Sequence, residues 1–295
     1  MNSELRTVSI IGAGRLGTAL GIALNKLGYK ITAVVSRKLQ HAKQSAKLIG
    51  ETLPLTSKHL SKIPQSEIIF IATPDDAIEE VASELTKTFS YNKPDFAFHT
   101  SGALSSEVLS VLRDKKISVG SIHPLISVSD SMIGAESLSK AFYCIEGERS
   151  AVKLGKKIVR DLGARSFSPR TKDKALYHAS AVVACGHLVA LFDIAVEMLT
   201  KCGLDSDSAR NALLPLVEST VENLSVSEPA KALTGTFARA DVTTVKKHLE
   251  AFERKKLEEA LKVYVELGKR SLELARQNGK DERTLNEIKK LLNQS

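Results

Sequence analysis

Tryptophan is absent from this sequence of 295 residues, and aromatic residues of all kinds make up only 5% of it. Proteins that bind single-stranded nucleic acid stack the bases on a series of aromatic side chains beside a basic groove. The formal net charge is +8, but the cations alternate with acidic residues along predicted helices, as in residues 253–259. We therefore predict no nucleic-acid partner and attribute the charge to solvated helix faces and to attraction for an anionic cofactor.

Cysteine is scarce as well, since the sequence contains only Cys144, Cys185 and Cys202. They are too far apart for the spacing of a metal site, and they form no plausible disulfide framework. We expect no metal, a reducing cytoplasmic environment, and three small buried apolar side chains.

Apolar segments of the kind that enter membranes are also missing. The first six residues lack the apolar core of a signal peptide. The most apolar later stretch, residues 179–199, is interrupted by His187, Asp193 and Glu197. It therefore predicts a buried helix of a soluble protein, with no membrane partner.

The sequence does contain a glycine-rich turn between two apolar strands, residues 8–11 and 31–35. The first strand is followed directly by Gly12-x-Gly14-x-x-Gly17. After this motif the apolar residues recur every three or four positions, as in a helix. In this context the glycines predict a dinucleotide site. Gly12 permits the tight turn, Gly14 lets the backbone approach a pyrophosphate, and Gly17 lets helix and strand pack closely. The free N–H groups at the start of the helix favour the anion.

The end of the second strand indicates which dinucleotide binds. An acidic residue about 20 residues after the glycine motif would bind the ribose hydroxyl of NAD. Here the strand ends in Ser36-Arg37-Lys38, without an acid. Two cations and a hydroxyl suit the 2′-phosphate of NADP(H), so we predict NADP(H) over NAD. Alternatively, Arg37 and Lys38 merely begin a solvated helix.

Further apolar strands are predicted at residues 67–72, 95–99, 117–122, 142–145 and 165–168. Parallel strands bind ligands at their carboxyl ends. The predicted cofactor-binding residues are Gly12, Gly14, Arg15, Leu16, Gly17, Ser36, Arg37, Lys38, Thr73, Pro74 and Thr100.

Strands alternate with helices only in the first part of the chain. We predict an α/β fold, in which a Rossmann-type, doubly wound, mostly parallel sheet over residues 1–168 precedes an all-α domain over residues 169–295. The second part shows only helical patterns, and its most apolar helix, at residues 174–202, is expected to be central. The other predicted helices cover residues 206–224, 243–278 and 283–292, with a loop over residues 225–241.

Several local motifs have the same order as in a known family. They are His99-Thr100-Ser101-Gly102-Ala103, Ser121-Ile122-His123-Pro124-Leu125, Tyr177-His178-Ala179-Ser180-Ala181, Leu233-Thr234-Gly235, Arg239-x-Asp241-x-x-Thr244 and His248-Leu249. Over nearly its whole length the chain resembles bacterial proteins with a Rossmann-like domain followed by a DUF2520 domain, which implies an NADP oxidoreductase. The layout resembles, more distantly, pyrroline-5-carboxylate reductases, prephenate dehydrogenases and 6-phosphogluconate dehydrogenase-type enzymes. That resemblance implies a homodimer formed through the helical domain.

The sequence departs from these families at four places. Thr236 follows Gly235 where the family has proline, and Ala240 replaces a usual glycine. Cys185-Gly186 stands where Ser-Asn is common. In the wider superfamily a helix lysine has an asparagine four residues on, whereas Lys174 is followed there by His178.

Four residues are candidates for catalysis. His123 resembles the His-Pro element of prephenate dehydrogenases, and its imidazole could donate a hydrogen bond or exchange a proton. Lys174 and His178 lie four residues apart, hence on one face of a helix. Ser101 offers a hydroxyl at a strand end. Alternatively, His123 is satisfied locally beside Pro124, and Lys174 is a solvated residue of the first helical turn.

Thr234 and Arg239 are the predicted substrate-binding residues, because they lie in the loop and Arg239 could bind a carboxylate through two hydrogen bonds. Arg239 could instead pair with Asp241, although we expect Asp241 to cap the helix that begins near Thr243.

Together these features predict an NADP-dependent oxidoreductase that transfers hydride between NADP(H) and a small-molecule substrate. Both carbonyl/hydroxy and imine/amine pairs fit. The alternative is a non-catalytic NADP(H)-binding sensor or scaffold, since a fold does not establish chemistry.

Overall fold

The computed structural model describes residues 6–89 and 93–295, and the chain divides into two compact units, Met1–Val183 and Ala184–Ser295. The predicted absence of a signal segment concerns residues 1–6, of which residues 1–5 lie outside the described residues.

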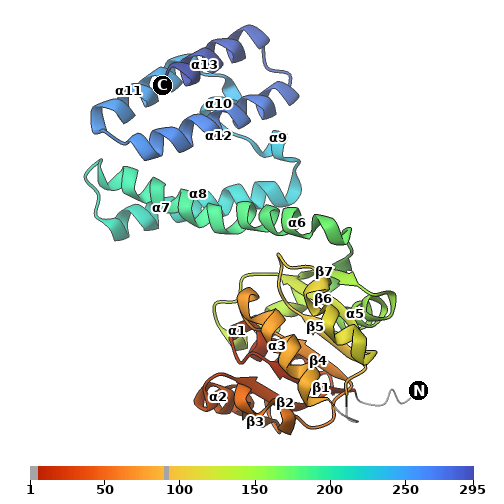
Figure 1. Cartoon of the computed structure of the whole chain (residues 1–295). Coiled ribbons are helices and arrows are strands. Elements are labelled where there is room, and N and C mark those ends of the chain that lie inside the picture. Colours follow the sequence, from red (N-terminus) through yellow and green to blue (C-terminus); the bar gives the residue numbers. More distant parts are fainter. Residues whose placement is uncertain (1–5, 90–92) are drawn as a thin grey trace. The chain divides into compact units, whose positions relative to one another are not determined.

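One sheet of eight strands organises the first unit, in the order β3-β2-β1-β4-β5-β6-β7-β8 (Figure 1). Strands β1 to β6 pair in parallel, β7 runs antiparallel to β6, and β8 is parallel to β7. The predicted mostly parallel, doubly wound sheet is confirmed. The strands are β1 (Thr7–Ile11), β2 (Lys30–Ser36), β3 (Leu53–Thr56), β4 (Ile68–Ile71), β5 (Phe96–His99), β6 (Ser118–Leu125), β7 (Phe142–Gly147) and β8 (Arg165–Phe167).

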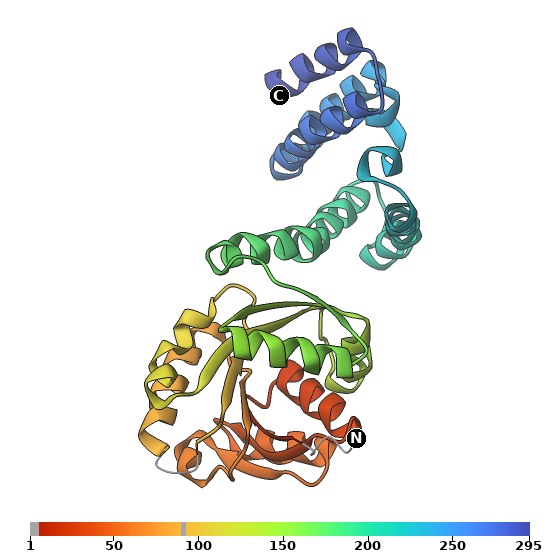
Figure 2. The same ribbon diagram turned by 90° about the vertical axis from the view of Figure 1, so that its right-hand side faces the viewer.

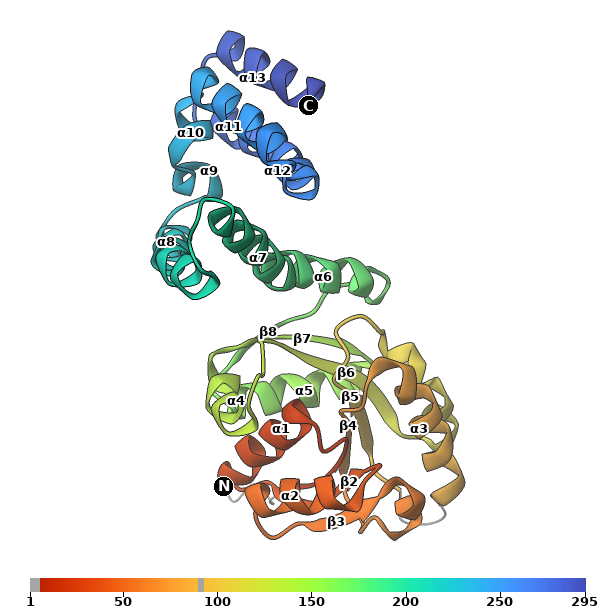
Figure 3. The ribbon, with the colours of Figure 1, turned by 90° about the vertical axis from the view of Figure 1, so that its left-hand side faces the viewer.

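The sheet is covered on both faces, so its central strands are apolar on both sides. Val8 and Ile10 pack with α1 (Arg15–Lys26), α2 (Leu39–Ile49), α4 (Ser131–Ser137) and α5 (Arg149–Asp161). Their neighbour Ile11 points to the other face, where α3 (Asp75–Thr88) and the 3₁₀ helices η1 (Ser57–Lys62) and η2 (Ser106–Lys115) pack. Figure 3 shows the two helical layers on opposite sides of the sheet.

The second unit is helical (Figure 2). Its described residues form seven α-helices, and its core lies between the last long ones. The helices are α7 (His187–Thr200), α8 (Ser206–Val226), α9 (Pro229–Ala232), α10 (Gly235–Arg239), α11 (Val242–Lys255), α12 (Glu258–Gln277) and α13 (Glu282–Gln294). The predicted single helix over residues 243–278 is wrong, because Lys256 adopts a left-handed conformation with φ 54° and ends α11. The predicted loop over residues 225–241 contains α9 and α10.

The stretch Thr171–Thr200 is one continuous helical path, made of the 3₁₀ turn η4 (Thr171–Asp173), α6 (Lys174–Ala181), a π-helical segment (Val182–Gly186) and α7. By length and composition alone it could cross a membrane, yet only 6% of its apolar window is buried. Within a single chain the prediction of a buried central helix is therefore wrong, because α7 has no buried residue. Likewise Cys144 is buried as predicted, whereas Cys185 and Cys202 are exposed.

Candidate functional site

The glycine turn after β1 has the shape that its sequence predicts. Gly12 has φ 120°, and a Cβ there would lie 2.3 Å from the Ala72 carbonyl oxygen. A Cβ on Gly17 would lie 2.0 Å from the Gly12 carbonyl oxygen, so neither position admits a side chain. Gly14, in contrast, has no atom within 4 Å of its missing Cβ. The turn is therefore tight where the strands meet and open where an anion would approach.

Helix α1 begins directly after this open glycine. Its N-cap residue Gly14 offers no side chain to cap the first turn, and Arg15 is exposed while Leu16 is half-buried. The first N–H groups of a helix lack partners inside the helix and attract an anion. This end of α1 therefore fits a pyrophosphate.

The end of strand β2 lies beside this turn. The Gly12 amide donates to the Val35 carbonyl (2.8 Å), which brings the turn against the end of β2. There Ser36 is half-buried, and Arg37 and Lys38 are exposed. Among the described residues neither cation forms an ion pair. Their charges are thus available to a phosphate.

The ends of β4 and β5 offer hydroxyl groups beside the glycine turn. The Ala72 amide donates to Ile11 (2.7 Å), and the Thr100 amide donates to Ile71 (3.1 Å), which places the ends of β1, β4 and β5 in sequence along one edge. The Thr73 hydroxyl is buried and has no hydrogen-bond partner in the described part of the chain. An orphaned hydroxyl beside an open cradle fits a bound polar ligand. Pro74 precedes the first turn of α3.

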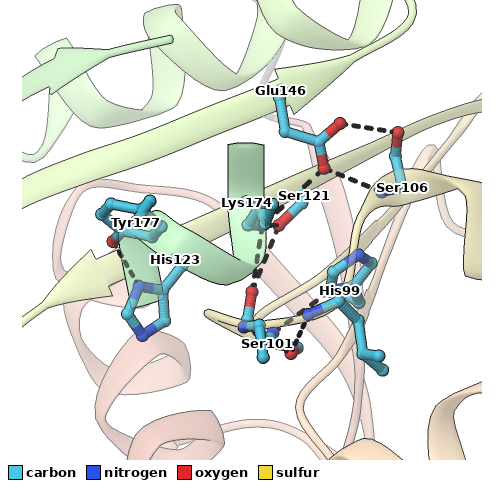
Figure 4. A network of polar contacts seen from close by, with 10 residues as sticks. His99, Ser101, Ser106, Ser121, His123, Glu146, Lys174 and Tyr177 are labelled. Carbon is cyan, nitrogen blue, oxygen red and sulfur yellow. Dashed lines mark hydrogen bonds and ion pairs between the residues drawn. The ribbon is translucent and has the colours of Figure 1, made fainter. Parts of the chain in front are cut away.

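A buried polar network lies beneath the next strand ends, and Figure 4 shows its members. Lys174 is 1% exposed, although it is the first residue of α6. Its Nζ donates to the Ser101 carbonyl oxygen (3.1 Å) and to the Ser121 hydroxyl, and lies 3.7 Å from Glu146 Oε1. Glu146 is also buried and accepts hydrogen bonds from the Ser106 amide (2.7 Å) and hydroxyl (2.9 Å).

This network gives Lys174 partners inside the protein. Burial lowers the pKa of the Lys174 ammonium group, and the Glu146 carboxylate opposes that shift. The sequence placed Lys174 near a site but missed Glu146. The available signal was a lone acidic residue in the otherwise apolar strand β7, where a carboxylate requires a partner.

His123 lies half-buried near the end of β6, close to the second turn of α6 (Figure 4). Its Nδ1 is 2.6 Å from the Tyr177 hydroxyl, and its ring meets the His178 ring edge-on at 5.8 Å. A Cβ on Gly102 would lie 2.4 Å from His178 Nδ1 and 2.9 Å from His123 Nε2. Only glycine lets the end of the β5 turn come this close to both imidazoles. The structure thus brings together the predicted residues His123, Lys174 and His178.

The environment keeps the His123 imidazole neutral. Burial lowers its pKa to about 4, and the charges of Lys174 and His178 act in the same direction. Burial raises the pKa of the Tyr177 hydroxyl, which therefore stays protonated. Either atom can donate in the hydrogen bond between Tyr177 and Nδ1, and in the tautomer in which Tyr177 donates, the proton of the neutral ring lies on Nε2.

Ser101 and His99 shape the turn after β5. The Ser101 amide donates to His99 Nδ1 (3.1 Å), and the Ser101 hydroxyl accepts from the amides of Ala103 (3.2 Å) and Leu104 (3.0 Å). His99 is completely buried, and burial followed by the Lys174 charge lowers its pKa to about 3. The Ser101 hydroxyl thus holds the turn, and its catalytic role stays a prediction.

The predicted substrate-binding residues Thr234 and Arg239 are exposed residues of the second unit, at the start and end of α10. Substrate binding by them stays a prediction. The predicted cap is confirmed, since Asp241 accepts from the Thr244 amide (3.0 Å) and hydroxyl (2.7 Å). Ala240 has φ 55°, which explains why a glycine suits this position.

Two family models match this chain, one over each part. The model of a Rossmann-like domain matches residues 1–124, and that of DUF2520, a domain of unknown function, matches residues 141–271. An NAD(P)+-dependent glycerol-3-phosphate dehydrogenase of Thermoanaerobacter sp. (strain X514) is 32% identical over 94 residues. That alignment covers 29% of this chain and 28% of the dehydrogenase, so the chain matches little more than a quarter of that relative's length.

Solved structures share the fold over most of the chain. Protein TM1727 of Thermotoga maritima has a TM-score of 0.73 at 25% identity, over 92% of this chain and 100% of that one. A Plasmodium falciparum pyrroline carboxylate reductase with NADP bound has a TM-score of 0.57 at 12% identity, over 98% of each chain. The latter likeness concerns the fold alone. With both domain models matched in order, the chain belongs to the proteins that join a Rossmann-like domain to a DUF2520 domain.

Proposed function

We propose that this protein is an NADP-dependent oxidoreductase that transfers hydride between NADP(H) and a small-molecule substrate. The observation that carries the proposal is the succession of strand ends in the first unit. An open glycine cradle follows β1, two cations follow β2, an orphaned hydroxyl follows β4, and a neutral imidazole lies near the end of β6. Cofactor binding and a polar group for the substrate thus share one edge of the sheet.

Each part has a role that its chemistry supports. The cradle at Gly14 and the first turn of α1 would hold the pyrophosphate, and Arg37 and Lys38 would bind the 2′-phosphate. The Thr73 hydroxyl would hydrogen-bond the bound cofactor. When bound, NADPH supplies the hydride.

His123 would polarise the substrate. In the tautomer in which Tyr177 donates to Nδ1, the Nε2–H group would donate a hydrogen bond to the oxygen of a carbonyl or the nitrogen of an imine. A histidine whose pKa lies near 4 is neutral at pH 7 and acts as a hydrogen-bond donor rather than as a charge. A carbonyl oxygen and an imine nitrogen can both accept this hydrogen bond, so the site fits either substrate pair.

A fluorescence titration with NADPH and NADH tests the cofactor. We expect wild-type protein to bind NADPH at least tenfold more tightly than NADH, and Arg37→Asp to lose that preference. Arg254→Asp is the matched control, because Arg254 is an exposed residue of the second unit with the same change in charge. Binding of neither nucleotide by folded protein would end the proposal.

A non-catalytic NADP(H) sensor is the second candidate. It is favoured by the burial of Lys174, whose ammonium group has two hydrogen-bond acceptors and one ion-pair partner inside the protein. It predicts cofactor binding without turnover across a panel of carbonyls, imines and hydroxy acids. Turnover that His123→Gln abolishes would exclude it.

We further propose a homodimer formed through α7 and α8. Val189 on α7 is 69% exposed and Leu216 on α8 is 63% exposed, and apolar surface of this kind supports an interface. Sedimentation should show a dimer at micromolar concentration that Val189→Glu with Leu216→Glu dissociates. Ile133→Glu, at an exposed residue of α4, is the control. The three free thiols support a reducing, cytoplasmic location.

A further inference from the structure

Helix α6 is held on the sheet in an unusual way. A surface helix is ordinarily fixed by a stripe of apolar side chains. In α6 the one fully buried residue is Lys174, whereas its leucine, Leu176, is 74% exposed. Among the described residues, the only fully buried contacts of this helix with the first unit are thus those of one ammonium group, and the half-buried Tyr177 and His178 add their contacts with His123.

We propose that the buried Lys174–Glu146 pair is a positioning device for His123, fixing the first turn of α6 so that Tyr177 and His178 in the next turn bracket the imidazole. Residues three and four positions apart share one face of a helix, so the anchor and the two aromatic side chains face the sheet together. The catalytic meaning of this device rests on the proposed function, whereas its geometry does not.

The contacts of the pair are directional, which an apolar anchor would not provide. Glu146 Oε1 accepts the Ser106 amide, and Oε2 accepts the Ser106 hydroxyl, so the carboxylate has one orientation. Buried ion pairs of this kind can specify register rather than add stability. Here the pair would fix the position of α6 along β6. Ser121 on β6 lies opposite Glu146 on β7, and Lys174 contacts both.

The pair also fixes the turn on the other side of His123. Lys174 Nζ donates to the Ser101 carbonyl, and the next residue, Gly102, packs against both imidazoles. His123 is therefore enclosed between two segments, the β5 turn and α6, that share a single anchor.

The positive charge of Lys174 also affects the pKa of His123. The titratable groups around this imidazole are Lys174, Tyr177 and His178 on α6, Cys144 on the paired strand β7, and His99 on β5. Among their charges, that of Lys174 contributes most to the lowering of the His123 pKa after burial itself. Removal of this charge should therefore be visible in the titration of His123.

The test uses the full chain with Lys174→Met and Glu146→Gln combined, which removes both charges while keeping side-chain size. We expect histidine-ring NMR, assigned with His123→Gln, to show the His123 pKa raised by at least one unit, a tenfold change in proton affinity. Lys87→Met with Glu84→Gln, an exposed pair on α3, is the matched control and should leave it unchanged. An unchanged His123 titration in the folded double variant would overturn the proposal.

A milder variant decides the question if the double variant does not fold. Ser106→Ala removes only the hydroxyl that donates to Glu146 Oε2. We expect the amides of residues 174–178 to exchange at least tenfold faster, with those of α3 unchanged. Equal protection of α6 in variant and wild type would contradict the positioning role.

Neither readout needs turnover or a bound nucleotide. NADPH affinity, measured in parallel, should change less than twofold, because the pair does not belong to the glycine cradle. If the wild-type protein does not bind NADPH, only the proposed function is refuted. If the pKa of His123 is unchanged in the double variant, only the positioning role is refuted.

Discussion

Replacing Lys174 by methionine should destabilise the first unit strongly, because it leaves the Glu146 carboxylate buried without a counterion. The two charged atoms are 3.7 Å apart. At an effective dielectric constant near 20, charges at this distance attract by about 4 kcal/mol. Breaking a buried pair by removing one partner costs roughly 3–5 kcal/mol. We expect Lys174→Met to lie in that range.

The partner substitution should be less harmful, and the double substitution milder than Lys174→Met. Glu146→Gln leaves a lysine whose pKa burial already lowers, so the lysine can release its proton and limit the cost. In the double variant no charge is buried, but the Ser101 carbonyl and the Ser121 hydroxyl lose a donor. An unsatisfied buried group costs about 1–3 kcal/mol, so we expect a loss of about 2 kcal/mol.

The assay is urea unfolding at pH 7, followed by hydrogen exchange at the amides of β4 and β6 so that the first unit is measured by itself. The exposed pair Lys87–Glu84 supplies the control cycle, for which each substitution should change stability by less than about 0.5 kcal/mol. If the double variant of the buried pair loses the sum of the two single losses, the two groups are not coupled and the reasoning fails.

Other predictions follow from glycines, a helix end and two histidines whose pKa values are lowered. Gly14→Ala should fold normally but bind NADPH at least tenfold more weakly, whereas Gly17→Ala, whose Cβ would overlap a carbonyl oxygen, should unfold the first unit, as thermal scans and titrations would show. Lys256→Gly should stabilise the second unit by about 1 kcal/mol in urea unfolding, because Lys256 has φ 54°; a loss of stability would contradict this. His99 and His123 have pKa values of about 3 and 4, below the ordinary 6.5, so the unfolded chain binds more protons between those limits. Stability should therefore fall as pH drops from 6.5 to 4, and a melting temperature that is flat over this window would refute the assignment.

The part of the fold that the sequence predicts best is the one whose causes are local. The first strand, the glycine turn and α1 follow from residues within one short stretch, and the structure gives each glycine its expected surroundings. Strand β3 was missed because it is four residues long and contains Pro54, which is uncommon within a sheet. Composition predicted burial of α7, but composition does not say which surface covers a helix.

The candidate site could be predicted only in part, because its contacts depend on pairing between distant strands. His123 was predicted from its position at a strand end, and Lys174 and His178 from their spacing on one helix face. Tyr177 was named only as part of a motif and not as a site residue. Glu146 was missed, since its approach to Lys174 requires β7 to run antiparallel to β6 with Ser121 opposite Glu146. A register of that kind is fixed by the whole sheet and cannot be read from one strand.

The antiparallel pairing of β7 with β6 has a practical consequence for anyone dividing this protein. The Rossmann-like match ends at residue 124 and the DUF2520 match begins at residue 141, yet β7, β8 and α6 belong to the first compact unit. A fragment ended at residue 124 would lose the strand that covers β6 and would expose a hydrogen-bonding edge with apolar side chains. Such edges pair with other chains and aggregate. A fragment meant to be soluble should therefore extend to Val183, beyond residue 124 where the Rossmann-like match ends.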